Sequence, residues 1–524
     1  MTRNLAFLLL AFLLAVMIFS PSASTATDTV KVEGGLISGA TADAVCSFKG
    51  IPFAAPPVGE LRWKAPQPVA AWQGVRECNA FGPECPQALY PQGSMYYRAP
   101  QKQSEDCLYL NVWTAAKANE KRPVMVWIHG GALTRGSGST PTYDGTAFAK
   151  KGVVLVTINY RLGPLGYLAH PELTGESPNH ASGNYGVLDQ LAALKWVQKN
   201  IAAFGGDPKR VTIFGESAGS WSVNTLVATP LAKGLFHRAI GESGASFNRG
   251  VSLKDAEKIG VAFGKSAGAD TLKALRAVPA EKIIEVFDKD NEGRKFRTVV
   301  NVDGWVLPDE IRSIFAASKH NDVPVIVGSN ANEMTTLTVP AMVPKTMADY
   351  RKRVEAQYGE AVKEFEALYP AKSEADIAAA YLDSLRDTTF TLGMRTWARM
   401  TGHSKAYLYF FSHVPPNPNS KYLGAYHASE IAYVFRNLNP NNKLLQEADH
   451  KLAETMMSYW VNFATTGNPN GKGLPEWKAY EQKTEPYLDF GDPVQLRNHL
   501  LKEQLDFLEK FQSRRATTTA GGME

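Results

Sequence analysis

The chain has little of what marks several common classes of protein. It has only four cysteines in 524 residues, and no two of them form the close Cys-x-x-Cys pair of a zinc knuckle. It has no cluster of basic residues, and its formal charge of +5 is small for this length. We therefore expect neither a metal nor nucleic acid as a partner.

Apolar runs of membrane-spanning length are also lacking. At the N-terminus, Arg3 precedes an apolar run from Leu5 to Phe19, and small residues follow around Ser22 to Ala26. This pattern predicts a signal peptide over residues 1–26, with a retained anchor as the alternative. The run is shorter than the roughly 20 residues that a membrane helix needs. We expect a secreted or periplasmic protein with no integral membrane segment once the signal is removed.

The chain has no Asn-x-Ser/Thr sequon, which favours a bacterial source because a secreted eukaryotic chain of this length would usually carry some. The four cysteines are Cys46, Cys78, Cys85 and Cys107, all in the first quarter. An even number of cysteines in an exported chain predicts two disulfides. Spacing alone leaves all the pairings open.

What the chain does have is the composition of a large globular protein. Apolar residues make up 44% and charged residues 20%, so the chain can bury a sizeable core. No internal repeat or linker divides it. We expect one domain over residues 27–515 and a disordered tail over residues 516–524.

Short apolar runs alternate with helical patterns along this domain. The expected strands are Val30–Ile37, Cys46–Phe53, Cys107–Trp113, Pro123–Ile128, Val153–Tyr160, Val211–Phe214, His237–Ile240 and Val323–Val327. The expected helical regions are Asn184–Phe204, Thr346–Ser404 and His499–Arg515. Continuous apolar strands separated by helices predict an α/β fold, with a mostly parallel sheet covered on both faces. Ligands of such sheets bind beyond the carboxyl ends of the strands.

The segment Arg210–Ser220 is typical of a nucleophile elbow. A β-branched strand leads into Gly215-Glu-Ser-Ala-Gly219, and a helix is expected from Ser220 to about Val227. Glycines flank the tight turn, which places Ser217 at a helix N-terminus where backbone N–H groups stabilise negative charge.

A second copy of the pattern, Gly264-Lys-Ser-Ala-Gly268, shows that five residues alone are a weak signal. The residues before Ser266 have helical spacing and form no strand, so we interpret this serine as the polar end of a helix.

A serine hydroxyl needs a base to take its proton and an acid to orient that base. His427 lies in a loop that enters a helix, and Glu333 follows an expected strand at the same sheet edge as Ser217. The chain order Ser217, Glu333, His427 is that of an α/β-hydrolase. Glu216 and Glu430 are expected to be hydrogen-bond partners beside this triad, Ser243 to brace the site, and His129 to brace the loop after the strand Pro123–Ile128.

The chain also resembles the type-B carboxylesterase family, which includes the cholinesterases. The matching stretches are Phe48–Gly59, Ser104–Trp113, Val126–Gly131, Asn159–Arg161, Asn184–Gly186, Asp189–Gln190, Phe204–Pro208 and Phe214–Gly219, in the order of the family. The resemblance runs from about residue 30 to 510 and implies a Ser-Glu-His triad at Ser217, Glu333 and His427.

Further expectations come from this resemblance. It implies an oxyanion hole built from the N–H groups of Gly131, Ala132 and Ala218, and it places the first family disulfide at Cys85 and Cys107. By elimination, Cys46 would pair with Cys78. No cofactor is implied, and the substrate is expected to be a small-molecule ester.

Two rival hypotheses remain. The same triad would serve a carbamate, amide or lactone hydrolase, and the fold also occurs in non-catalytic binding or adhesion members of the family. Choline esters are disfavoured, because residues 86–106 contain Tyr90, Tyr96 and Tyr97 but no tryptophan for a quaternary ammonium group. Nothing in the sequence bears on the oligomeric state.

Overall fold

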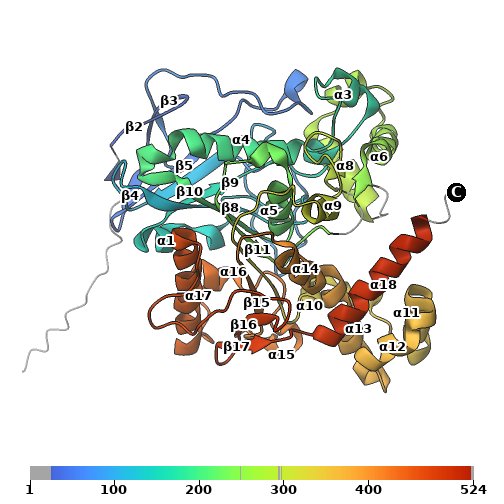
Figure 1. Cartoon of the computed structure of the whole chain (residues 1–524). Coiled ribbons are helices and arrows are strands. Elements are labelled where there is room, and N and C mark those ends of the chain that lie inside the picture. Colours follow the sequence, from blue (N-terminus) through green and yellow to red (C-terminus); the bar gives the residue numbers. More distant parts are fainter. Residues whose placement is uncertain (1–24, 27, 248–249, 293–295, 297, 521–524) are drawn as a thin grey trace, which may run out of the picture.

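A twelve-stranded sheet organises the described residues of the computed structural model, which are 25–520 without 27, 248–249, 293–295 and 297 (Figure 1). Its middle strands run parallel, in the spatial order β9 (Val154–Ile158), β8 (Arg122–Ile128), β10 (Gly206–Glu216), β11 (Arg238–Glu242), β14 (Val325–Asn330), β15 (Ala406–Phe411) and β16 (Pro486–Phe490).

The two edges of the sheet are antiparallel. Beyond β9 lie β7 (Tyr109–Thr114), β5 (Val45–Pro52), β4 (Ala40–Ala42) and β1 (Thr25–Ala26), and beyond β16 lies β17 (Gln495–Asn498). Two small sheets are made by β2 (Val30–Val32), β3 (Gly35–Ser38) and β6 (Val75–Glu77), and by β12 (Val251–Ser252) and β13 (Asn301–Val302).

Strand β8 shows why the sheet is buried on both faces. Its side chains alternate, so Val124 and Val126 join one hydrophobic cluster while Met125 and Trp127 join the cluster on the opposite face. All four are fully buried. A strand with two apolar faces needs a covering layer on each side, which confirms the predicted α/β class with a mostly parallel sheet.

Helices supply these layers, as Figure 1 shows. Helices α4 (Tyr185–Asn200) and α5 (Ala218–Ala228) pack their apolar residues into the first cluster. Helices α1 (Thr146–Lys150) and α17 (Glu447–Thr466) pack into the second.

A third cluster lies beside the sheet, among helices from the last third of the chain. It includes α11 (Met347–Tyr358), α12 (Val362–Leu368), α13 (Ile377–Arg386), the start of α14 (Leu392–Met400) and α18 (Lys502–Ala520). The first four of these helices occupy the region expected to be helical from Thr346 to Ser404.

The remaining helices are shorter or lie toward the surface. They are α2 (Gly163–Tyr167), α3 (Pro171–Glu176), α6 (Leu253–Ser266), α7 (Leu272–Ala277), α8 (Ala280–Glu292), α9 (Ile311–Ala316), α10 (Met334–Leu337), α15 (Ser420–Leu423) and α16 (Ile431–Val434).

The structure describes only parts of the expected signal peptide and of the expected C-terminal tail. Helix α18 continues through residues 516–520, where a disordered tail was expected, because no glycine or proline interrupts it before Gly521. Residues 521–524 lie outside the described residues. Most of the expected signal peptide, residues 1–24, also lies outside them, while Thr25–Ala26 pair with β4.

Within the described ranges, no helix combines the length and the apolar character that crossing a membrane requires.

Candidate active site

Ser217 occupies a strained turn between a strand and a helix. Strand β10 ends at Glu216, α5 begins at Ala218, and Ser217 between them has φ 56° and ψ −121°. Its N–H donates to the carbonyl of Glu242 on the neighbouring β11 (2.8 Å), and its carbonyl accepts from Trp221 N–H (2.9 Å). Non-glycine residues rarely adopt positive φ, so the fold holds this serine in place against a local cost.

The flanking glycines are required by close backbone contacts. A Cβ atom at Gly215 would lie 2.5 Å from the carbonyl oxygen of Ile128, and one at Gly219 would lie 2.0 Å from the same oxygen. Any larger residue would push β8 away from the turn. The second copy of the motif differs, since Ser266 is the exposed last residue of α6 and a Cβ at Gly268 would meet nothing within 4 Å.

His427 and Glu333 lie together at the carboxyl edge of the sheet. Glu333 follows β14 and is fully buried, and its Oε1 accepts a hydrogen bond from Asn330 N–H (2.7 Å). Its Oε2 is 2.6 Å from Nδ1 of the buried His427. This geometry suits an acid that orients an imidazole and stabilises its charged form.

The other ring nitrogen of His427 contacts a second carboxylate. Nε2 is 3.1 Å from Oε1 of Glu216, and within the described chain it makes no hydrogen bond to the Ser217 hydroxyl. Burial acts to lower the pKa of His427, but Glu216 and Glu333 outweigh it and raise that pKa to about 9. Burial raises the pKa of Glu216 to about 8, although His427 opposes the rise.

Two further glutamates lie behind this pair. Glu430 accepts from Asn330 Nδ2 at 2.5 Å, and Glu242 accepts from Trp460 Nε1 at 2.8 Å. Burial, and next the charge of Glu333, raise the pKa of Glu430 to about 7. Glu430 thus reaches the site through Asn330, which also donates to the carbonyl of Tyr426, the residue before His427 (2.9 Å).

The loop after β8 presents backbone donors beside Ser217. Gly131 has φ 107° and Ala132 has φ 55°, and a Cβ at Gly131 would lie 2.2 Å from the carbonyl oxygen of Arg135. In the described chain, the N–H groups of Gly131 and Ala132 enter no hydrogen bond, and Ala218 N–H is at the start of α5, where helices leave donors unpaired. These donors are free to receive a negatively charged oxygen.

His129 makes several contacts beside the site, whereas the side chain of Ser243 makes no hydrogen bond among the described residues. Nδ1 of His129 is 2.8 Å from Gly130 O, its ring stacks on Tyr160 (4.5 Å between centroids), and burial lowers its pKa to about 4. These contacts are those of a neutral residue that supports the loop. The buried hydroxyl of Ser243 has no hydrogen-bond partner among the described residues.

A cavity of about 490 Å³ opens above these residues. Ser217, Glu216, His427, Gly131 and Ala132 line its base. Part of its wall comes from the segment between Cys85 and Cys107, which we call the disulfide loop. The residues of this loop that line the cavity are Gln87, Ala88, Leu89, Tyr90, Met95, Tyr96, Tyr97 and Arg98.

Tyr96 joins the disulfide loop to the histidine, a contact that the sequence analysis missed. Its hydroxyl lies 3.1 Å from the carbonyl oxygen of His427 and 2.7 Å from Oγ1 of Thr336 on α10. Tyr96 and His427 are 331 residues apart in sequence. In the sequence, the only indication of this contact is that an aromatic residue lies between two cysteines.

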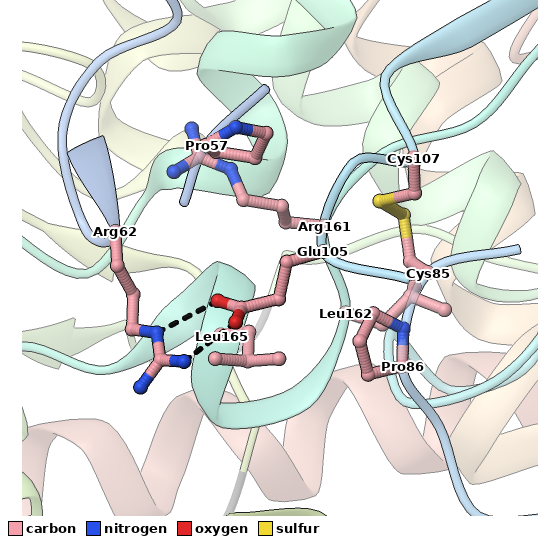
Figure 2. Close-up of a pocket in the computed structure, with 9 residues that line it drawn as sticks. All are labelled: Pro57, Arg62, Cys85, Pro86, Glu105, Cys107, Arg161, Leu162 and Leu165. Atoms are coloured by element: carbon pink, nitrogen blue, oxygen red, sulfur yellow. Dashed lines mark hydrogen bonds and ion pairs between the residues drawn. A yellow bond between two sulfur atoms is a disulfide. The ribbon is translucent and has the colours of Figure 1, made fainter. Parts of the chain in front are cut away.

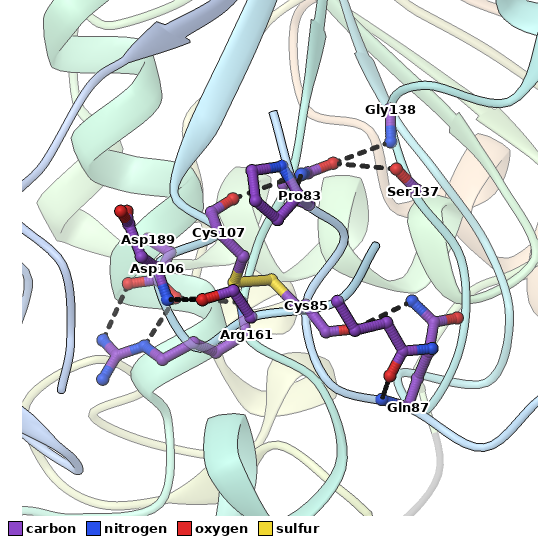
Figure 3. Close-up of a disulfide and its surroundings, with 12 residues drawn as sticks. Pro83, Cys85, Gln87, Asp106, Cys107, Ser137, Gly138, Arg161 and Asp189 are labelled. Carbon is purple, nitrogen blue, oxygen red and sulfur yellow. Dashed lines mark hydrogen bonds and ion pairs between the residues drawn. A yellow bond between two sulfur atoms is a disulfide. The ribbon is translucent and has the colours of Figure 1, made fainter. Parts of the chain in front are cut away.

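The disulfide loop is closed by a bond between Cys85 and Cys107 (Figure 3). Gln87 ties it to the oxyanion side of the site, because its amide donates to Gly136 O (2.9 Å) and accepts from Gly136 N–H (2.7 Å). Asn159 supports the base of the loop by donating to Pro83 O and Cys107 O (3.1 and 3.2 Å).

Ion pairs lie next to the disulfide. Arg62 makes two hydrogen bonds to Glu105 (2.7 and 2.5 Å), as Figure 2 shows. Arg161 makes two to the fully buried Asp189 (2.8 and 2.7 Å), visible in Figure 3. Two-point pairing of this kind fixes orientation as well as charge.

The expected disulfide between Cys46 and Cys78 is wrong, since both are free thiols. Cys78 lies beside Lys49, whose N–H donates to its carbonyl (2.7 Å), whereas Cys46 is three residues further back along β5. Three strand residues span about 10 Å. That distance exceeds the roughly 7 Å limit between bridged Cα atoms.

A serine in a strand–turn–helix elbow, beside a histidine–glutamate pair at the carboxyl edge of a parallel sheet, defines the class of the protein as an α/β-hydrolase. Comparison with known proteins gives the family. The family model described as "Carboxylesterase family" matches residues 24–508. The chain therefore belongs to the carboxylesterase family and is a carboxylic ester hydrolase.

Individual relatives agree with this assignment. The chain is 40% identical over 479 residues to fumonisin B1 esterase of Sphingopyxis macrogoltabida, covering 88% of this chain and 86% of the relative. It is 37% identical to para-nitrobenzyl esterase of Bacillus subtilis (90% and 96% covered). A solved carboxylesterase of Geobacillus stearothermophilus superposes with a TM-score of 0.81 at 35% identity (92% and 99% covered).

Proposed function

We propose that this esterase works through an acyl-enzyme intermediate formed on Ser217, with His427 as base and Glu333 as the orienting acid. The observation that carries the proposal is the 2.6 Å contact between His427 Nδ1 and Glu333 Oε2, next to the cavity that Ser217 lines. Glu333 holds the ring so that Nε2 faces the nucleophile side of the site.

The reaction begins when Ser217 Oγ attacks the ester carbonyl and its proton moves to His427 Nε2. In the structure, Nε2 contacts Glu216, the residue adjacent to Ser217 in sequence. We infer that a small rotation of the imidazole moves Nε2 from this carboxylate to the Ser217 hydroxyl. Three backbone donors, from Gly131, Ala132 and Ala218, hold the tetrahedral oxyanion. Each such donor contributes on the order of 10²–10³ in rate.

Collapse of the intermediate expels the alcohol, which takes the proton from His427. Water then enters the cavity, gives its proton to the same nitrogen and attacks the acyl-enzyme. Ser217 Oγ then leaves with the proton from His427, which releases the acid and restores the resting state. Every proton moves through one imidazole, so the scheme needs no further acid or base.

A labelled fluorophosphonate tests this assignment directly, because it reacts with an activated serine. We expect one label per chain on Ser217, none on Ser217→Ala, and normal labelling of Ser266→Ala. The second variant is a matched control, since Ser266 stands in the same Gly-x-Ser-x-Gly pattern at the end of α6. Labelling that survives Ser217→Ala would contradict the proposal.

We also propose that the protein is exported and that its mature chain begins near Ala26. The N-terminal sequence pattern and the Cys85–Cys107 disulfide support this, since disulfides persist in oxidising compartments. N-terminal sequencing of protein from the culture medium or periplasm tests it. A mature chain that still begins at Met1 would contradict the proposal.

A further inference from the structure

The mouth of the catalytic cavity has exposed apolar side chains on both sides. Leu89, Met95 and Tyr97 project from the disulfide loop, and Leu337 ends α10; all four line the cavity. Val339 follows two residues later. Their exposed fractions lie between 37% and 58%, which is high for large apolar residues. We call these five residues the apolar rim.

The two sides of the rim are in contact. The hydroxyl of Tyr96 is 2.7 Å from Oγ1 of Thr336. Met95 and Tyr97 flank Tyr96 in the chain, and Leu337 follows Thr336, so the hydrogen bond brings the two apolar segments to one place. Contiguous exposed apolar groups at the edge of a cavity usually mark a binding surface rather than an accident of folding.

Charge at the mouth is neutralised. Arg98, which lines the cavity, pairs with the buried Glu84 (2.8 Å) and also donates to Thr140 Oγ1 (3.2 Å). Arg135, nearby in the same loop as the oxyanion donors, pairs with Asp288 (3.0 Å). An anionic substrate would have to compete with these carboxylates for its partners, whereas a hydrocarbon chain needs only apolar contact.

We propose that the apolar rim binds the part of a substrate's hydrocarbon chain that extends out of the cavity, so that esters with medium-length or long unbranched chains are favoured over short ones. This proposal rests on the proposed function, because it takes Ser217 at the base of the cavity as the reacting group. The substrate's own hydrocarbon chain is the expected occupant, because rim residues line the same cavity as Ser217 and His427.

The test is a series of p-nitrophenyl esters from acetate to decanoate, with a second series of alkyl acetates from ethyl to decyl. The first series lengthens the acid and the second lengthens the alcohol, so the two identify which chain leaves through the mouth. Each methylene that becomes buried should raise kcat/KM by up to about fourfold. We expect the increase in one series, up to the length at which the chain passes the rim.

Rim variants sharpen the test. Leu337→Gln and Met95→Gln should lower the decanoate-to-acetate ratio of kcat/KM, or the corresponding decyl-to-ethyl ratio, by about fivefold each. Val75→Thr, an equally exposed apolar residue on β6, is the matched control and should leave the ratio unchanged. A wild-type protein without chain-length dependence, or rim variants with an unchanged ratio, would overturn the proposal.

A binding measurement separates this proposal from the catalytic one. Calorimetry on Ser217→Ala with 1-decanol and 1-butanol requires no turnover. We expect the longer alcohol to bind at least tenfold more tightly, and Leu337→Gln in the same background to remove most of that difference. Equal affinity for the two alcohols would count against the rim even if Ser217 proved to be the nucleophile.

Discussion

The sheet edge and the disulfide loop line one cavity, and they are built differently. At the sheet edge, Ser217 directly follows the buried strand β10 and Glu333 lies three positions after the end of β14, so the backbone of the core sets their positions. Between Cys85 and Cys107 there is no helix or strand among the described elements, and the loop is held by its disulfide and by hydrogen bonds from Gln87 and Tyr96.

This difference separates two requirements of an esterase. Bond cleavage needs atoms held within fractions of an ångström, which a close-packed sheet supplies. Substrate choice depends on the wall of the cavity, and a surface loop can change there without disturbing the core. The two regions meet at His427, whose side chain pairs with Glu333 and whose carbonyl accepts from Tyr96.

The largest expected effect comes from the sheet side. Glu333→Gln keeps the shape of the side chain but removes the charge that stabilises the imidazolium of His427. We expect kcat to fall on the order of 10⁴-fold while circular dichroism stays unchanged. Glu355→Gln, an exposed residue of α11, is the matched control. A loss below tenfold would mean that another carboxylate orients the histidine.

The next largest effect is a loss of folding stability when the disulfide loop is opened. The double variant Cys85→Ser/Cys107→Ser frees a loop whose ends are 22 residues apart, which costs about 3 kcal/mol. Urea unfolding should show this loss, and KM should rise because the cavity wall is no longer closed. Cys46→Ser serves as the control, since that thiol has no disulfide partner. Equal stability of the two variants would show that hydrogen bonds alone hold the loop.

A smaller effect at the sheet edge is a shift in pH dependence. His427 must be neutral to accept a proton, so activity is lost as the pH falls through its pKa, which Glu216 and Glu333 raise. Glu216→Gln removes one of these charges, lowers that pKa, and should move the acid limb of kcat/KM down by about one pH unit.

Glu430→Gln is the comparison for this shift. Its carboxylate also raises the pKa of His427, but less than Glu216 does, so it should move the acid limb by a smaller amount. If the acid limb lies at the same pH in Glu216→Gln and in the wild type, Glu216 does not raise the pKa of His427.

The smallest expected effect tests the link between the two regions. Tyr96→Phe removes the hydroxyl that contacts His427 O and Thr336 Oγ1, at a cost of about 1 kcal/mol. We expect kcat to fall about fivefold with little change in KM for p-nitrophenyl acetate. Tyr422→Phe, on an exposed tyrosine of α15, is the control. If the two variants behave alike, the loop does not position the histidine.

Much of the sheet could be predicted because its strands are short runs of apolar residues, which the sequence shows directly. The apolar run Pro123–Ile128 is buried on both faces as β8, and the glycines of the Ser217 turn are required by contacts with Ile128. The sequence analysis predicts neither β15 nor β16, although both are buried strands of the sheet.

The loop side could not be predicted in the same way. A segment without secondary structure has no periodicity, so nothing in the sequence connects Tyr96 to a histidine 331 residues away. The contact of Glu216 with Nε2 was anticipated only as a general hydrogen-bond role beside the triad. Pairing Cys46 with Cys78 failed because elimination among cysteines ignores where the strands place them.

The unpaired thiols give the folded protein a chemical asymmetry. Cys78 is fully buried, and burial raises its pKa to about 11, which keeps it in the unreactive protonated form. Cys46 is half-buried on β5, the third strand from one edge of the sheet, with its sulfur 3.3 Å from Thr41 Oγ1. Under non-reducing conditions, a maleimide should therefore attach a fluorophore or a solid support at one position, Cys46 on β5.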